Sequence, residues 1–192
     1  MENMDRLTSK MKQFSTIGCC GIDCGLCPRY HTDSPSACPG CGAPDFRDKH
    51  PSCGFITCCV NKHGFETCAD CPEFPCTRFD AERKGLDSFV THRKVFDNLN
   101  AIRDDGLNAL LDRQSERIDL LKRLLMDHND GRSKSYFCLA CALLPEEALP
   151  EIRYAINFPT TAADAKEKNR RIKKTIDSLA ERYDIELKLR KG

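Results

Sequence analysis

The stretch CCGIDCGLCPRY, Cys19 to Tyr30, decides how this chain folds. It holds four cysteines within nine residues, and a proline follows the last of them directly. Such a cluster is typical of a disulfide knot, a metal site, an iron–sulfur cluster or a thiol redox centre. The remainder of the sequence narrows this choice.

Cysteine density is the strongest signal in the 192-residue chain. Twelve of its 14 cysteines lie between Cys19 and Cys76, and the other two are Cys138 and Cys141. The first residues, MENMDRLTSKMK, contain no apolar stretch of the kind found in a secretory signal. We therefore expect a cytoplasmic protein, and in a reducing compartment this density indicates metal binding rather than disulfides.

Charge and hydropathy limit the classes of partner. The formal net charge is +1, so no strong overall field favours nucleic acid. No run of about 18 apolar residues occurs, so the sequence predicts no membrane span. The partner stays unknown at this level: a protein partner is compatible with the sequence, nucleic acid is disfavoured and no membrane is expected.

The amino-acid composition and the hydrophobic periodicity of the chain change near residue 80. Residues 19–79 carry seven prolines and show little helical or strand periodicity, so they need cross-links to offset their chain entropy. We therefore predict a cysteine-rich metal-binding module over residues 1–80 and an α-helical domain over residues 81–192. The expected fold class is mainly α, with a loop-rich, metal-stapled N-terminal module packed on a C-terminal helical bundle.

Apolar residues at helical spacing carry the prediction for the second half. Phe89, Phe96 and Leu99 share one face, and Gly106 is a plausible stop. Further helices are expected over residues 107–125, 136–144 and 149–156, and Thr161 with Asp164 resembles the capping signal of a last helix that carries Ile172, Ile176, Leu179 and Tyr183. Residues 185–189 alternate with period two and predict one short strand.

Three CxxC pairs make metal the best-supported chemistry, because two thiolates separated by two residues can reach one ion. Cys24, Cys27, Cys38 and Cys41 form C-x2-C-x10-C-x2-C, the simplest four-thiolate zinc site. Cys20 is a candidate ligand of the same or a neighbouring ion. Cys53, Cys58 or Cys59, Cys68, Cys71 and Cys76 supply a second site. The expected cofactor is zinc, with two or three ions, and in each doublet, Cys19-Cys20 and Cys58-Cys59, one member is expected to be spare.

An iron–sulfur cluster is the alternative, because Cys20, Cys24 and Cys27 form C-x3-C-x2-C. A radical enzyme of that spacing needs a large βα barrel, which this chain is too short to form. A thiol redox centre needs a CxxC at a helix start after a strand, and no strand clearly precedes Cys24 or Cys68.

The other chemistry-bearing residues have simpler explanations. Cys138 and Cys141 lie in an apolar helix and are expected to pack in a core. His31, His50 and His63 are weaker candidates than the thiols, and the basic run at residues 169–174 is expected to be a solvated helix face. No GxGxxG, HExxH or GxSxG motif occurs, so no catalytic apparatus is visible; the enzyme question stays open, and a binding or scaffold role is favoured.

The motifs in combination resemble an uncharacterised cysteine-rich family of unknown function that is common in anaerobic microbes. The resemblance rests on CGIDCGLCPRY, CPGC at Cys38–Cys41, HGFETCADCPEFPC at His63–Cys76, FVTHRKVFDNLNAIRDDGL and NDGRSKSYFCLACALLP. It implies a cytoplasmic, metal-binding or zinc-binding protein without a settled activity. The ligands that it implies are Cys20, Cys24, Cys27, Cys38, Cys41, Cys53, Cys58 or Cys59, Cys68, Cys71 and Cys76, and Cys19 is extra to the pattern.

Overall fold

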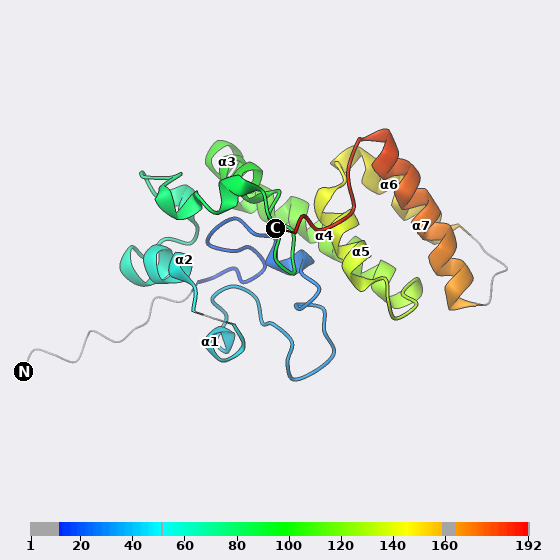
Figure 1. The fold of residues 1–192 in the computed structure, drawn as a ribbon, viewed down its shortest axis with the longest axis horizontal. Coiled ribbons are helices and arrows are strands. Elements are labelled where there is room, and N and C mark those ends of the chain that lie inside the picture. Colours follow the sequence, from blue (N-terminus) through cyan, green and yellow to red (C-terminus); the bar gives the residue numbers. More distant parts are fainter. Residues whose placement is uncertain (1–11, 51, 159–163, 192) are drawn as a thin grey trace, which may run out of the picture.

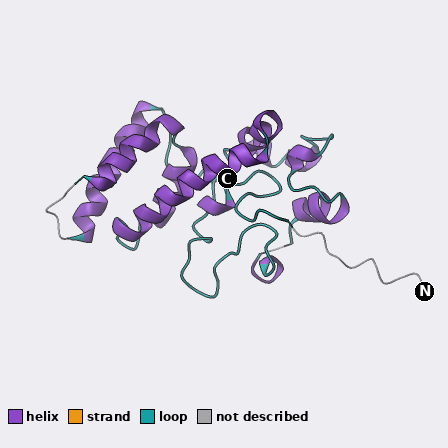
Figure 2. Cartoon of the chain, turned by 180° about the vertical axis from the view of Figure 1, so that it is seen from behind, coloured by secondary structure: helices purple, strands orange, loops and turns teal. Residues whose placement is uncertain are grey.

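The computed structural model describes residues 12–50, 52–158 and 164–191. In these ranges the chain consists of helices and loops, without a strand (Figure 2). The α-helices are α1 (Phe46–Lys49), α2 (Gly54–Ile56), α3 (Val95–Asp105), α4 (Leu107–Asp127), α5 (Lys134–Leu143), α6 (Leu149–Asn157) and α7 (Ala165–Arg182). The predicted mainly α class, with a loop-rich cysteine-rich region next to helices, is therefore confirmed.

The arrangement is elongated, with α5, α6 and α7 at one end and the cysteine-rich loops at the other (Figure 1). The long helix α4 contacts α3, α5 and α6 and so links the two ends. Short 3₁₀ turns interrupt the loops at Cys24–Leu26, Cys68–Asp70, Thr77–Phe79, Glu82–Lys84 and Glu146–Ala148. None of the described helices has the length and apolar character needed to cross a bilayer.

The helix boundaries follow the residues that predicted them. Gly106, with φ of 89°, separates α3 from α4, a backbone conformation that a side chain would strain. Pro145 follows Leu144, the C-cap of α5, and ends the helix because it cannot continue the hydrogen-bonded ladder. Asp164 caps α7 by accepting a hydrogen bond from the Lys166 backbone N–H at 3.1 Å, whereas Thr161 lies outside the described residues.

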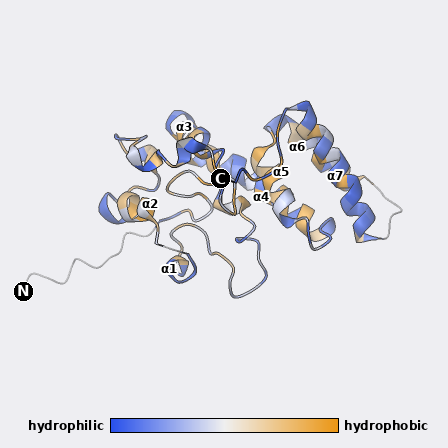
Figure 3. Ribbon diagram, in the orientation of Figure 1, coloured by the Kyte–Doolittle hydropathy of each residue, from blue (hydrophilic) through white to orange (hydrophobic). Residues whose placement is uncertain are grey.

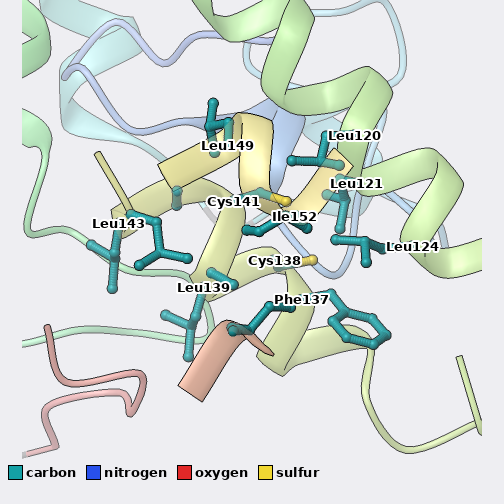
Figure 4. Close-up of a cluster of buried hydrophobic side chains, with 14 of the residues drawn as sticks. Leu120, Leu121, Leu124, Phe137, Cys138, Leu139, Cys141, Leu143, Leu149 and Ile152 are labelled. Atoms are coloured by element: carbon teal, nitrogen blue, oxygen red, sulfur yellow. The ribbon is translucent and has the colours of Figure 1, made fainter. Parts of the chain in front are cut away.

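The core of the helical end is built around α5. Every residue from Phe137 to Leu143 is buried, and Figure 4 shows the sulfurs of Cys138 and Cys141 among Leu120, Leu121 and Leu124 of α4 and Ile152 of α6. α7 is largely hydrophilic with apolar positions among its charged residues (Figure 3), and it closes this core with Ile172, Ile176 and Leu179. Cys138 and Cys141 are thus core residues, as their apolar context predicted.

A second core joins the cysteine-rich region to the first helices of the C-terminal half. Ile17, Cys20, Phe74 and Phe79 pack there with Val95, Leu99, Ile102 and Leu110. Gly21 makes this approach close, because a Cβ at that position would lie 2.6 Å from the Val95 carbonyl oxygen. The domain boundary near residue 80 stays a prediction.

The strand predicted over residues 185–189 is wrong. Within the described chain this segment is irregular, and its alternating Ile185, Leu187 and Leu189 pack against the helical core. Two of its carbonyl oxygens accept hydrogen bonds from a side chain and not from a neighbouring strand. The Arg93 guanidinium donates to Glu186 O at 2.7 Å and to Lys188 O at 2.9 Å. Burial alternates with period two here, but none of the residues that the structure describes pairs with this segment as a strand.

Candidate metal centre

Backbone hydrogen bonds bring three separate cysteine segments together. The Cys68 N–H donates to Cys19 O at 2.8 Å, and the Cys41 N–H donates to Ser15 O at 2.8 Å. Gly40 makes the second approach feasible, because it adopts φ of 92° and a Cβ there would stand 2.4 Å from the Ser15 oxygen. Cysteines more than 40 residues apart in sequence therefore become neighbours.

Five sulfurs lie in a continuous series, which we call the thiol chain: Cys24, Cys41, Cys19, Cys59 and Cys68. The sulfurs of Cys19 and Cys41 are 3.7 Å apart. Cys41 also interacts with the Cys24 thiol, and Cys59 interacts with the thiols of Cys19 and Cys68. Cys19, Cys41 and Cys59 are buried, so this series lies inside the fold.

Along the thiol chain, cysteines with a lowered pKa alternate with cysteines with a raised pKa. Hydrogen bonds from Cys19 and Cys24 lower the pKa of Cys41 to about 3, and hydrogen bonds from Cys19 and Cys68 lower the pKa of Cys59 to about 4. The same contacts, together with burial, raise the pKa values of Cys19, Cys24 and Cys68. These contacts favour ionisation at Cys41 and Cys59, and the thiolate is the form of cysteine that binds metal; in its protonated form the Cys59 thiol donates to Phe65 O at 3.5 Å.

One buried cation supports these thiolates. The Lys12 side chain is fully covered, and its ammonium donates to Glu66 Oε1 and to Phe14 O, both at 2.6 Å. Its charge contributes to lowering the pKa values of both Cys41 and Cys59. Lys12 thus places one positive charge near the thiol chain, but Glu66 pairs with it and the Asp70 carboxylate acts in the opposite direction at Cys59.

A second group of cysteines surrounds a small cavity of about 30 Å³, which we call the cysteine cavity. A π-helical turn at Thr57–Lys62 continues α2 and carries Cys58 and Cys59. The cavity is lined by Cys58, Cys59, Cys68, Cys71 and Cys76, with His63, Arg78 and the rings of Phe55, Phe65, Phe74 and Phe79. Cys59 and Cys68 belong both to this cavity and to the thiol chain.

The remaining predicted ligands lie at the edge of these two groups. Burial raises the pKa of Cys20, whose electrostatic neighbours are Cys41, Cys53 and Glu82. Burial raises the pKa of Cys27, whose electrostatic neighbours include Cys38, while the backbone N–H groups of Arg29 and Tyr30 act in the opposite direction. Cys27 also acts on Cys24, so it lies beside the Cys24 end of the thiol chain.

Cys19 is the residue that sequence reasoning left out. The family motif that the chain resembles begins at Cys20. Because the side chains of adjacent residues point apart, Cys20 was predicted to be a metal ligand and Cys19 was not. Here the Cys19 sulfur connects Cys41 to Cys59, and its backbone N–H also points to the Cys41 sulfur at 3.5 Å. The sequence signal that could have indicated it is only the doublet itself.

A polar clamp holds the first cysteine loop against α3 and α4. Asp23 accepts from Asn98 Nδ2 at 2.9 Å and from Gln114 Nε2 at 2.8 Å, and Gln114 also donates to Thr16 O at 3.0 Å. Burial raises the pKa of Asp23, while the two amides act in the opposite direction. The clamp sets the position of Cys20 and Cys24, which flank Asp23.

The donor chemistry fits zinc, although the donors do not yet converge. In residues 12–50, 52–158 and 164–191, no three His, Cys, Asp or Glu side chains are placed so that they could hold an ion. What the fold supplies is a set of neighbouring thiols, two of them with contacts that favour ionisation. His31 is occupied, since its Nε2 contacts Gly25 O at 2.7 Å.

A cavity of about 510 Å³ lies elsewhere, between α6 and α7, and contains no cysteine. His128, Tyr154, Phe158, Lys168 and Ile172 are among its lining residues. It is separate from the thiol chemistry.

Comparison with known proteins supports the resemblance drawn from the motifs. Residues 16–81 match the model of the family described as "Protein of unknown function (DUF3795)". This segment contains all twelve N-terminal cysteines, so similarity to an uncharacterised cysteine-rich family is confirmed for that region. No curated protein and no solved structure matches the chain.

Proposed function

We propose that this cysteine-rich protein binds zinc through its N-terminal thiols, and that two or three ions fold the region from Cys19 to Cys76. The metals are mainly structural, and the folded module serves as a binding or scaffold surface in the cytoplasm. The activity of such a scaffold is recognition, so the metals need no open coordination position.

The single observation that carries this proposal is the 3.7 Å separation between the sulfurs of Cys19 and Cys41. A tetrahedral zinc ion with Zn–S bonds of about 2.3 Å places neighbouring sulfurs about 3.8 Å apart. These two thiols already stand at that separation, and Cys24 and Cys59 are the next thiols on either side. For an ion to replace the thiol protons, the sulfurs of the other ligands must move closer to Cys19 and Cys41.

Two neighbouring groups of ligands follow from the contacts. Cys19, Cys24 and Cys41 would supply one ion, with Cys20 as the nearby fourth candidate. Cys59 and Cys68 would supply the other ion, together with cysteines that share their cavity, Cys58, Cys71 and Cys76. Cys27 and Cys38, which lie beside Cys24, would supply ligands for a third ion, whereas Cys53 is among the neighbours of Cys20.

An iron–sulfur cluster is the alternative, and the size of the cysteine cavity bears on it. The cavity of about 30 Å³ has room for about two waters, since one water needs about 10–15 Å³ of such space. A single ion suits that space, whereas a cluster places its cysteines on several iron atoms and pushes the thiolates further apart. The contact between Cys19 and Cys41 also favours one shared ion.

The test is metal and acid-labile sulfide analysis of protein purified without oxygen. We expect two or three zinc ions per chain and no sulfide. A brown protein with iron and sulfide would establish the cluster instead, and a metal-free protein with an intact N-terminal region would refute metal binding altogether.

Two matched variants locate the ions. Cys19 and Cys141 are buried to the same degree, at 1% and 0% exposure, but Cys19 lies among other thiols of the N-terminal region, whereas the charged neighbours of Cys141 are Arg117 and Arg153. Cys19→Ala should lose about one zinc per chain, whereas Cys141→Ala should keep the full content. Equal zinc content in both variants would exclude Cys19 from the ligand set.

A further inference from the structure

Three side chains just before α3 form a hydrogen-bonded series that the metal proposal does not use. Ser88 Oγ lies 2.9 Å from His92 Nε2, and His92 Nδ1 lies 2.7 Å from Glu82 Oε2. A carboxylate accepts but does not donate, so the Nδ1 atom carries the proton that points at Glu82. In the neutral ring, Nε2 is then the acceptor of the Ser88 hydroxyl proton.

This order of groups is that of an activated serine: nucleophile, general base and a carboxylate that orients the base. The two hydrogen bonds have the lengths that the arrangement requires. The side chains of His92 and Glu82 are 16% and 12% exposed, so the base and its orienting group are largely shielded. Ser88 is half-buried, and its hydroxyl reaches the base from the loop between Gly85 and α3.

The loop that carries Ser88 is held at both ends. The Asp87 carboxylate accepts from the His92 backbone N–H at 2.7 Å and from the Arg190 N–H at 2.9 Å. The Lys191 ammonium donates to Ser88 O. A nucleophile in a fixed position loses little entropy on reaction, which is a condition for catalysis by a small site.

A donor for a developing oxyanion stands next to the nucleophile. Within the described part of the chain, the backbone N–H of Phe89 has no acceptor. The N–H of the residue after a serine nucleophile commonly stabilises the tetrahedral intermediate. Leu86 and Phe89, both 43% exposed, lie close to Ser88 in the chain; Leu86 offers apolar surface to an acyl group, whereas the Phe89 ring has the Arg29 guanidinium over its face at 5.3 Å.

We propose that Ser88, His92 and Glu82 form an esterase site for carboxylic esters with a small apolar acyl group. Ser88 Oγ attacks the ester carbonyl while its proton passes to His92 Nε2. The tetrahedral intermediate collapses, the alkoxide leaves with the proton from His92, and an acyl-serine remains. Water then gives a proton to His92 and attacks the acyl-serine, which releases the carboxylic acid and restores the Ser88 hydroxyl.

This inference is independent of the metal proposal, because it uses no thiol. The first test is covalent labelling of the wild-type protein as purified, whatever its metal content, with an alkyl fluorophosphonate, which reacts with activated serine hydroxyls. Trypsin releases Gly85–Arg93, GLDSFVTHR, in which Ser88 is the one serine. We expect the phosphonyl mass on this peptide, and its absence there would overturn the proposal.

The second test is hydrolysis of 4-nitrophenyl acetate. Thiols also react with activated esters, so the relevant quantity is the steady-state rate that Ser88→Ala removes. We expect Ser88→Ala and His92→Gln to lower that rate at least about tenfold, and Glu82→Gln to lower it less, because general base catalysis contributes about 10²- to 10⁴-fold.

The matched control is Ser115→Ala on the exposed face of α4, which should keep the wild-type rate. Helical circular dichroism of each variant verifies folding, and the labelling test needs no variant at all. An unchanged rate in folded Ser88→Ala would show that the three side chains only hold the loop together.

Discussion

The Asp87 carboxylate is the anchor of both the Ser88 loop and the C-terminal tail, and its removal should release them together. Its side chain is fully covered and accepts from the backbone N–H groups of His92 and Arg190 and from Thr91 Oγ1 at 3.2 Å. Asp87→Asn preserves the shape but places an amide N–H₂ against one of these donors. One charge-assisted hydrogen bond is then lost, which costs about 1.5–3 kcal/mol.

The assay is urea unfolding of Asp87→Asn at pH 7, followed by helical circular dichroism, with hydrogen exchange of the amides at residues 185–190. We expect the free energy of unfolding to fall by about 2 kcal/mol and the tail amides to exchange faster. Asp33→Asn is the control, because Asp33 is exposed, and such surface changes stay within about 0.5 kcal/mol. An Asp87→Asn protein as stable as Asp33→Asn would refute the anchoring role.

The same anchor predicts a pH dependence. Burial acts to raise the pKa of Asp87, but the N–H groups of Arg190 and His92 and the nearby Arg93 guanidinium outweigh it and lower the pKa. A lowered pKa in the folded state adds stability above the unfolded value of about 3.9, and this stability is lost as pH falls through the folded pKa. The difference between wild type and Asp87→Asn should therefore be constant from pH 7 to about 4.5 and shrink at lower pH.

Two further outcomes test the core and the clamp. Leu124→Ala should lower the free energy of unfolding by about 2–5 kcal/mol, because Leu124 is fully buried beside α5, whereas Met126→Ala, at 77% exposure, should change it by less than about 0.5 kcal/mol in the same urea titration. Gln114→Ala removes a donor to Asp23 and should weaken zinc binding about 10- to 100-fold in a chelator competition. The control Gln13→Ala changes an exposed residue and should leave the zinc affinity unchanged. Equal zinc affinities of the two variants would show that the clamp does not support the metal ligands.

The helical half was predictable because its signals are local. The apolar period of residues 107–125, the stop at Gly106 and the break at Pro145 each act within one or two turns, and α4 and α5 begin and end close to them. The strand over residues 185–189 failed for the opposite reason. A strand needs a partner, and the acceptors of this tail face a guanidinium from residue 93.

The candidate metal centre also has a part that was predictable from local sequence and a part that was not. The CxxC pairs were sufficient to predict that the region from Cys19 to Cys76 concentrates thiols, and metal binding by them stays a prediction. The order of the sulfurs was not predictable, because backbone contacts between residues far apart place Cys19 next to Cys41 and Cys59. The series of Ser88, His92 and Glu82 has no sequence motif, since its geometry depends on how one loop is anchored to the tail.

By itself, the amino-acid sequence determined the helical class of the second half, the loop-rich character of the first and the kind of ligand that the first half offers. These properties follow from residue type and short-range spacing. Only the tertiary structure decided which thiols meet, where the C-terminal tail lies and that a serine stands against a histidine. Those contacts join residues separated by up to about a hundred positions, and packing and hydrogen-bond satisfaction select them over the whole fold.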